Sequence, residues 1–232
     1  MAMADAHYNR VRRHFDAQYS MLQGRPSPAG VTGAAIGCLR DSELVGNALE
    51  IGCGGGANMR VLAESGMFRS VHGIDLSGTG ISRALAHLGP DGMRHDVLLH
   101  QGNVVRYTGA AEPYSLILIN SVFEYMLDQD KQRLVFRMMR STAPGGLNAI
   151  GMVTSLPHDF IEQRLGYPDM DTGHGRPMFS HGSAEVRRLD FESGLADMYR
   201  DAGWDVRMQR RYEAERNFVQ VGAEMLIAQK RL

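Results

Sequence analysis

Two carboxylates and a run of glycines form the part of this chain best suited to hold a ligand. Glu50 lies near the end of an apolar run, and Gly52, Gly54 and Gly56 follow at every second position before a helical pattern begins. Glycines are needed where the backbone takes a positive φ or where a ligand lies against bare main chain. A second short apolar run ends at Asp75. The succession of strand, glycine loop, helix, strand and acid predicts a nucleoside site in an α/β sheet.

The glycine loop by itself is compatible with two classes of ligand. Its spacing also fits the dinucleotide pattern Gly-x-Gly-x-x-Ala, with Gly52, Gly54 and Ala57 in the defining places. A carboxylate two residues before the first glycine would repel a pyrophosphate, but it suits a ligand with an ammonium and a sulfonium. Asp75 can accept hydrogen bonds from ribose hydroxyls in either class. Glu50 therefore favours the cationic ligand.

Alternating strands and helices must position these residues at one edge of a sheet. We expect strands at 47–51, 70–75, 97–101, 115–120 and 147–153, with helices at 58–65, 78–88 and 128–140. Pro144 and the two glycines after it are expected to stop the last of these helices and turn the chain. The alternation predicts a parallel, doubly wound α/β sheet.

The segments on either side of this alternation have a different character. Residues 1–45 are predicted to form an N-terminal helical segment, and residues 46–232 the main domain. Residues 155–188 are rich in glycine, proline and histidine, and a connection of this length predicts a lid or binding segment. A helix at 191–201 and two strands at 204–212 and 218–229 follow. The two strands are expected to pair as an antiparallel hairpin at one edge of the sheet.

Composition excludes several classes of protein. The 232 residues suffice for one large α/β domain, and a net charge of −1 gives no general electrostatic attraction to nucleic acid. Two cysteines, Cys38 and Cys53, form no disulfide framework, so we expect a reduced, cytoplasmic protein. No apolar run reaches the roughly 20 residues that span a bilayer. No ligand spacing predicts a metal site, and a small-molecule substrate is expected.

As a set, the motifs resemble class I S-adenosylmethionine-dependent methyltransferases of the small-molecule type. The matching stretches are 48–57, 71–77, 114–126, 143–152 and 200–206. The resemblance implies a Rossmann-like, seven-stranded sheet in the order 3-2-1-4-5-7-6, with strand 7 antiparallel and a lid between strand 5 and the last helix. It implies S-adenosylmethionine as the cofactor. It also implies methyl transfer to an O, N or S nucleophile of a small molecule by in-line displacement.

The resemblance assigns cofactor contacts to the turns that follow the strands. The backbone of Gly52 and Gly54 approaches the methionine part, Glu50 holds its amino group, and Asp75 binds the ribose hydroxyls. Asn103 stands where the family usually has Asp, so its adenine contact loses a charge. The resemblance also assigns Leu76 and Val104 beside the adenine and Asn120 at the methionine amine. Two further candidates come from their places in the chain: the small buried Cys53 in the loop, and Tyr19 on the N-terminal helix, which could close over the cofactor.

The acceptor side is less defined. Tyr125 stands where many relatives carry His, and it could orient a substrate. Glu124 beside it could do the same or cap the next helix. A base is needed only where the nucleophile carries a proton at working pH. His174 in the lid, three residues after Asp171, is the candidate base, although histidines in loops are more often surface residues.

Two other functions fit parts of the pattern. An NAD-dependent oxidoreductase would need a second mononucleotide half, and the chain offers a lid and a hairpin in its place. A non-catalytic, cofactor-binding regulatory protein on the same scaffold is permitted by the departures at Asn103 and Tyr125. The sequence leaves open the identity of the acceptor and whether the chain is a monomer or a homodimer.

Overall fold

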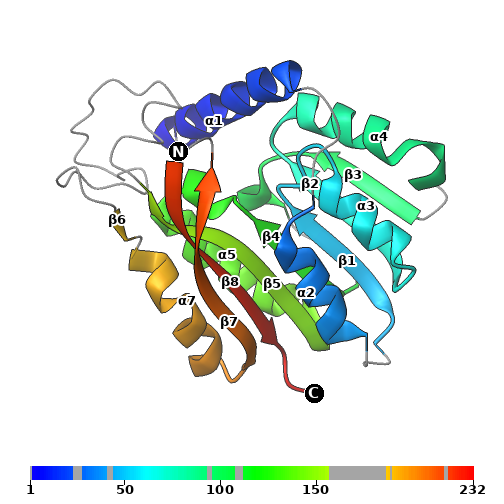
Figure 1. Cartoon of the computed structure of the whole chain (residues 1–232), viewed down its shortest axis with the longest axis vertical. Coiled ribbons are helices and arrows are strands. Elements are labelled where there is room, and N and C mark those ends of the chain that lie inside the picture. The colour runs from blue at the N-terminus through cyan, green and yellow to red at the C-terminus, as the bar shows by residue number, and fades with distance from the viewer. Residues whose placement is uncertain are drawn as a thin grey trace.

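A mixed β-sheet forms the centre of the computed structural model, which describes residues 2–22, 28–40, 44–92, 96–107, 112–156, 187–188, 190–216 and 219–232. The strand order is β3-β2-β1-β4-β5-β8-β7, and β6 pairs with β5 off this path (Figure 1). The strands are β1 (Gly46–Ile51), β2 (Phe68–Asp75), β3 (Asp96–Gln101), β4 (Tyr114–Asn120), β5 (Thr142–Leu156), β6 (Arg187–Arg188), β7 (Asp205–Arg216) and β8 (Val219–Gln229).

The first five strands are parallel, whereas β8 runs antiparallel to β5 and β7 antiparallel to β8. If the two-residue β6 is left out of the numbering, the order is 3-2-1-4-5-7-6 with the seventh strand antiparallel. The predicted topology is therefore confirmed, including the C-terminal hairpin. The sequence did not predict β6, which pairs with Ser155 and Leu156 at the end of β5.

Helices cover both faces of the sheet (Figure 1). One face carries α2 (Gly30–Leu39), α3 (Ala57–Glu64) and α4 (Gly78–Gly92), and the other carries α5 (Asp128–Ser141) and α7 (Asp190–Asp201). The side chains of β4 alternate between the two cores, with Leu116 and Leu118 on the α3 side and Ile117 and Ile119 on the α5 side. Because both faces are buried, β4 appears in the sequence as a continuous apolar run.

The N-terminal helix α1 (Ala2–Met21) lies across the carboxyl ends of the parallel strands and beside α4 (Figure 1). It covers neither face of the sheet. Two short 3-10 helices, η1 (Val104–Arg106) and η2 (Phe123–Tyr125), follow β3 and β4 at this same edge. The helices α1 and α2 confirm the helical character of the N-terminal residues, while the division into segments 1–45 and 46–232 stays a prediction.

The helix α5 ends at Ser141, and the expected turn lies at the start of β5, where Tyr114 pairs with Thr142 but Leu116 pairs with Leu147. The amide of Gly145 donates to the carbonyl of Lys230, and the carbonyl of Gly146 accepts from the amide of Lys230, both at 2.9 Å. A positive φ of 76° at Gly145 absorbs the irregularity within the strand. The predicted lid falls mostly on residues 157–186, which lie outside the described residues.

Candidate functional site

A cavity of about 930 Å³ lies at the carboxyl edge of the parallel strands, beneath α1. Its walls come from the glycine loop after β1, the ends of β2, β3 and β4, and the sheet-facing side of α1. Open α/β sheets bind ligands at this edge, where the strand order reverses between β1 and β4. The cavity is therefore the site that the sequence predicted.

The glycine loop exposes bare backbone to the cavity. The amides of Gly52 and Cys53 donate to the carbonyl of Ile74 at 2.8 and 3.2 Å, which ties the loop to β2. Gly52 and Gly54 have φ values of 74° and 48°. A Cβ at Gly52 would lie 2.2 Å from Cγ2 of Val122, and one at Gly54 would lie 2.2 Å from the hydroxyl of Tyr19. Both conformation and space therefore require glycine.

Glu50 is a buried carboxylate with one oxygen left for a ligand. It is 1% exposed, and its Oε1 accepts a 2.7 Å hydrogen bond from Nδ2 of Asn58. Its Oε2 has no hydrogen-bond partner among the described residues. Burial raises the pKa of Glu50 to about 8, against the opposing hydrogen bond from Asn58, and the nearby Asp75 adds to the rise. A cation placed at Oε2 would relieve this cost.

Asn58 itself is held by the segment before β1. Its Oδ1 accepts from Oγ1 of Thr32 at 2.8 Å and from the amide of Ala29 at 2.6 Å. Its amide group is thereby oriented so that the NH2 points to Glu50. Sequence reasoning missed Asn58, and the only available signal was a polar residue at the start of the helix after the glycine loop.

Asp75 faces the cavity from the end of β2. Its Oδ2 accepts from the Gly54 amide and its Oδ1 from the Ser77 amide, both at 2.8 Å. Burial raises the pKa of Asp75 in spite of these two hydrogen bonds. A carboxylate oxygen has more than one lone-pair site, so both oxygens can still accept from a ligand.

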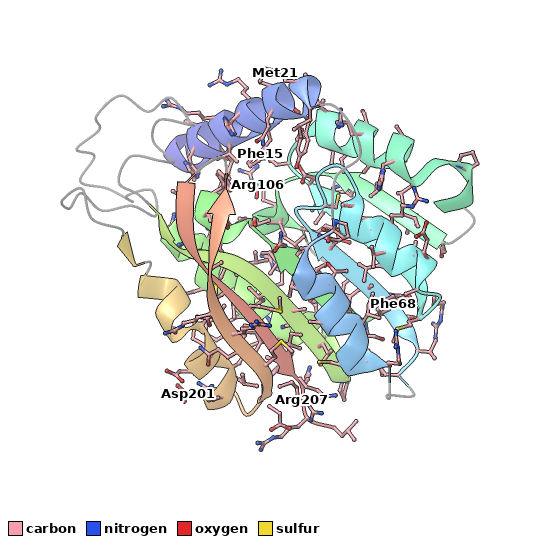
Figure 2. All side chains as sticks on the ribbon, in the orientation of Figure 1. Phe15, Met21, Phe68, Arg106, Asp201 and Arg207 are labelled. Carbon is pink, nitrogen blue, oxygen red and sulfur yellow. The ribbon has the colours of Figure 1, made fainter. Side chains whose placement is uncertain are left out.

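The roof of the cavity is made by α1. Phe15 contacts Tyr125 edge-to-face with ring centroids 4.8 Å apart, and Figure 2 shows Phe15 on the side of α1 that faces the sheet. Tyr19 stacks against Phe15 at 6.0 Å. Burial raises the pKa of Tyr19, so its phenol stays protonated. The lining also includes Tyr8, Val11 and Gln18 from α1.

The structure brings most of the sequence-predicted residues together. Those that line the cavity are Tyr19, Glu50, Gly52, Cys53, Gly54, Asp75, Leu76, Asn103, Val104, Asn120 and Tyr125. Asn103 also caps η1, because its Oδ1 accepts from the Val105 amide at 3.0 Å. Burial raises the pKa of the Cys53 thiol well above its usual value, which opposes a nucleophilic role. These cofactor roles stay predictions.

The acceptor candidates are separated. Tyr125 lines the cavity, and its carbonyl is hydrogen-bonded to Nε2 of His7 at 2.9 Å. Glu124 is 2% exposed and is not among the lining side chains. His174 lies outside the described residues. Ser121, next to Asn120, is the single non-glycine residue of the described part with a positive φ, 55°, and such strain is frequent at functional sites.

The electrostatic character of the site is acidic. Among the described residues that line it, Glu50 and Asp75 carry carboxyl groups and none is Lys, Arg or His. The described residues contain no cluster of three or more His, Cys, Asp or Glu that could hold a metal ion. Cys38 and Cys53 are free thiols. None of the described helices has the length and apolarity needed to cross a bilayer.

Residues 48–146 match a family model described as a methyltransferase domain. This stretch, which is less than half of the chain, is similar to a methyltransferase domain. The match covers the glycine loop, Asp75 and β4, so it agrees with the class and the S-adenosylmethionine cofactor predicted from those residues. A curated relative, the mitochondrial ubiquinone biosynthesis O-methyltransferase of Candida albicans, is 28% identical over 123 residues, 53% of this chain and 36% of that protein. The chain matches less than half the length of the curated relatives.

Solved structures share the fold of the methyltransferase domain over nearly the whole chain. The N-methyltransferase NodS of Bradyrhizobium japonicum WM9, in complex with S-adenosyl-L-homocysteine, has a TM-score of 0.62 at 17% identity, covering 97% of this chain and 98% of that one. The magnesium protoporphyrin IX methyltransferase of Synechocystis PCC 6803, with bound SAM, has a TM-score of 0.62 at 13% identity, covering 97% of each. At these identities the likeness concerns the fold.

Proposed function

We propose that this chain transfers a methyl group from S-adenosylmethionine to an O, N or S nucleophile of a small molecule by in-line displacement. The observation that carries the proposal is the second carboxylate oxygen of Glu50. It is buried beside a loop of bare backbone, with no hydrogen-bond partner among the described residues. A ligand with an ammonium group satisfies it, whereas a pyrophosphate would not.

The residues present fit this cofactor. Glu50 would hold the ammonium, the backbone of Gly52 and Gly54 would lie against the methionine part, and Asp75 would accept from the ribose hydroxyls. Further contacts are proposed for Leu76, Asn103 and Val104 at the adenine, for Asn120 at the methionine amine, and for Cys53 and Tyr19 around the loop. When bound, the cofactor supplies a methyl carbon already activated by the sulfonium.

The protein then has to position the acceptor and exclude water. The rings of Phe15 and Tyr125, together with Val11 and Met126, give the acceptor side an apolar wall. An anion finds no Lys, Arg or His among the described lining residues, and it lies close to the carboxyl groups of Glu50 and Asp75, which disfavours its binding. An uncharged or cationic acceptor with an apolar, flat body is therefore the best-supported class. Tyr125 would orient it, and Glu124, the preceding residue of η2, would act by supporting the position of Tyr125.

Titration calorimetry with S-adenosylhomocysteine tests the cofactor site. We expect saturable binding by the wild type and its loss in Asp75→Ala, because the carboxylate that also holds the Gly54 and Ser77 amides is removed. Asp201→Ala, at the exposed end of α7, is the matched control and should bind as the wild type does. Absence of binding by the wild type would refute the proposal.

Catalysis is tested by single-turnover transfer of a labelled methyl group into a metabolite extract. Transfer separates an enzyme from a non-catalytic binding protein, and a thermal shift with NAD but not with S-adenosylhomocysteine would favour the oxidoreductase. If His174 is the base, His174→Ala lowers turnover and leaves cofactor affinity unchanged. Unchanged turnover would remove His174 from the mechanism. The cytoplasmic location and a monomeric or homodimeric state stay predictions.

A further inference from the structure

One partly buried acid, Asp16, joins α1, which covers the cavity, to the first turn of α4. Oδ1 of Asp16, on α1, accepts from Oγ of Ser77 at 2.6 Å and from the amide of Thr79 at 3.2 Å. These donors belong to the start of α4, where amides have no partner within the helix. Burial works against ionisation, but the hydrogen bonds from Ser77 and Thr79 hold the pKa of Asp16 below its usual value. Asp16 is therefore a charged acceptor at neutral pH.

A second contact joins the same two helices, and here the donor lies on α4 and the acceptors lie at the end of α1. Nη1 of Arg83, on α4, donates to the carbonyl of Leu22 at 2.8 Å and to that of Tyr19 at 3.3 Å. These carbonyls belong to the last turn of α1 and the residue after it, where a helix lacks internal donors. Asp16 and Arg83 thus bracket the turn of α1 that carries Tyr19.

Ser77 continues the contact from Asp16 into the nucleoside site. It is fully buried, its Oγ accepts from the Gly80 amide at 2.9 Å, and its amide donates to Oδ1 of Asp75 at 2.8 Å. The other oxygen of Asp75 accepts from the Gly54 amide. A continuous series of hydrogen bonds therefore runs from α1 through Ser77 and Asp75 to the glycine loop.

Tyr19 of α1 packs against the same glycine loop and the start of α4. A Cβ at Gly54 would lie 2.2 Å from its hydroxyl, and a Cβ at Gly80 would lie 3.0 Å from its ring. The hydroxyl therefore stands directly over the loop whose amide Asp75 holds. A shift of α1 would move Tyr19 away from Gly54 and would release Ser77 on the other side of Asp75.

We propose that Asp16 is a positioning residue that couples the placement of α1 over the cavity to the orientation of Asp75 through Ser77. Asp16 and Ser77 do not line the cavity. Their effect on the cofactor is therefore indirect, and we expect it to change mainly the dissociation rate of the cofactor. The inference rests on the proposed cofactor site, and its test separates the two.

The test measures the Kd and the dissociation rate of S-adenosylhomocysteine for full-length variants. Asp16→Ala should raise the Kd about tenfold, mainly through faster dissociation, since a hydrogen bond to a charged group is lost. Asp16→Asn should stay within about threefold of the wild type, because its amide oxygen can accept from the same two donors. Asp5→Ala is the matched control: it removes another α1 acid, whose ion pair is with Arg106 of η1 and not with the start of α4, and should leave both values unchanged.

A double-mutant cycle tests the path through Ser77. If Asp16 acts through Ser77, Asp16→Ala combined with Ser77→Ala should bind no more weakly than the worse single variant. If the double variant instead raises the Kd by the product of the two single increases, the coupling through Ser77 is refuted. A wild-type dissociation rate in Asp16→Ala would also refute the proposal, and so would equal losses of affinity in Asp16→Asn and Asp16→Ala. If either alanine variant fails to fold, Arg83→Met removes the other contact between α1 and α4, and it should likewise speed the dissociation of S-adenosylhomocysteine. Failure of the wild type to bind would instead refute the cofactor site itself.

Discussion

Replacing Glu50 by Gln should make the ligand-free protein more stable at high pH. The pKa of Glu50 is raised from 4.5 to about 8 by burial, so the folded protein holds a proton between these values that the unfolded chain has lost. The free energy of unfolding of the wild type therefore falls as the pH rises through this window. At about 1.4 kcal/mol per pKa unit, the full penalty has an upper limit of about 5 kcal/mol. We expect Glu50→Gln to lack this pH-dependent loss of stability, because glutamine does not ionise.

The assay is urea denaturation of both proteins between about pH 5 and about pH 9, where the difference between the two curves isolates Glu50. Glutamine can keep the hydrogen bond from Asn58, and its NH2 takes the place of the protonated Oε2. The two proteins should therefore have similar stability near pH 5. By about pH 9 the variant should be more stable by at least about 2 kcal/mol. Glu64→Gln, an exposed i,i+4 partner of Arg60 on α3, is the matched control and should follow the wild type.

S-adenosylhomocysteine carries the ammonium group, and its binding should make the wild type more stable than Glu50→Gln at high pH. It supplies the cation that Oε2 lacks, so saturating ligand should remove most of the wild type's loss of stability above pH 7. Glu50→Gln should bind it at least about tenfold more weakly, because a buried ion pair is lost. Parallel stability curves for wild type and variant across the whole pH range would refute the assigned burial and charge of Glu50.

Three further variants probe the site and its support. Gly54→Ala should abolish cofactor binding by thermal shift, since its Cβ meets the Tyr19 hydroxyl at 2.2 Å, whereas Gly33→Ala, with open space at its Cβ, should be neutral or stabilising. Tyr199→Phe leaves Nδ2 of the fully buried Asn148 without its 2.8 Å partner and should cost about 1–3 kcal/mol in chemical denaturation. Phe15→Ala should weaken acceptor binding in steady-state kinetics more than S-adenosylhomocysteine binding. Equal losses would contradict its place on the acceptor wall.

Local chemistry explains why most of the fold was predictable. The apolar run of β4 and the glycines after β1 each specify one conformation through their own residues. The alternation predicted a parallel, doubly wound sheet, and the family resemblance implied the order of its strands. The turn at residues 143–146 was predicted, but the pairing of its two glycines with the far C-terminus was not. Such a partner, Lys230, lies too distant in sequence for a local pattern to reveal. The pairing of β6 with the end of β5 escaped prediction for the same reason.

The sequence alone determined the donor side of the site. The sequence predicts a nucleoside with a cationic tail from Glu50, the glycine loop and Asp75, because backbone freedom and charge are properties of individual residues. Tertiary structure decided what completes the site. Only the fold brings Asn58 to Glu50, Phe15 to Tyr125, and Asp16 to Ser77, since these contacts join elements whose separation in the chain carries no periodic signal. The glycine loop marks where the cofactor is expected to lie, and the packing of α1 determines how it would be held there.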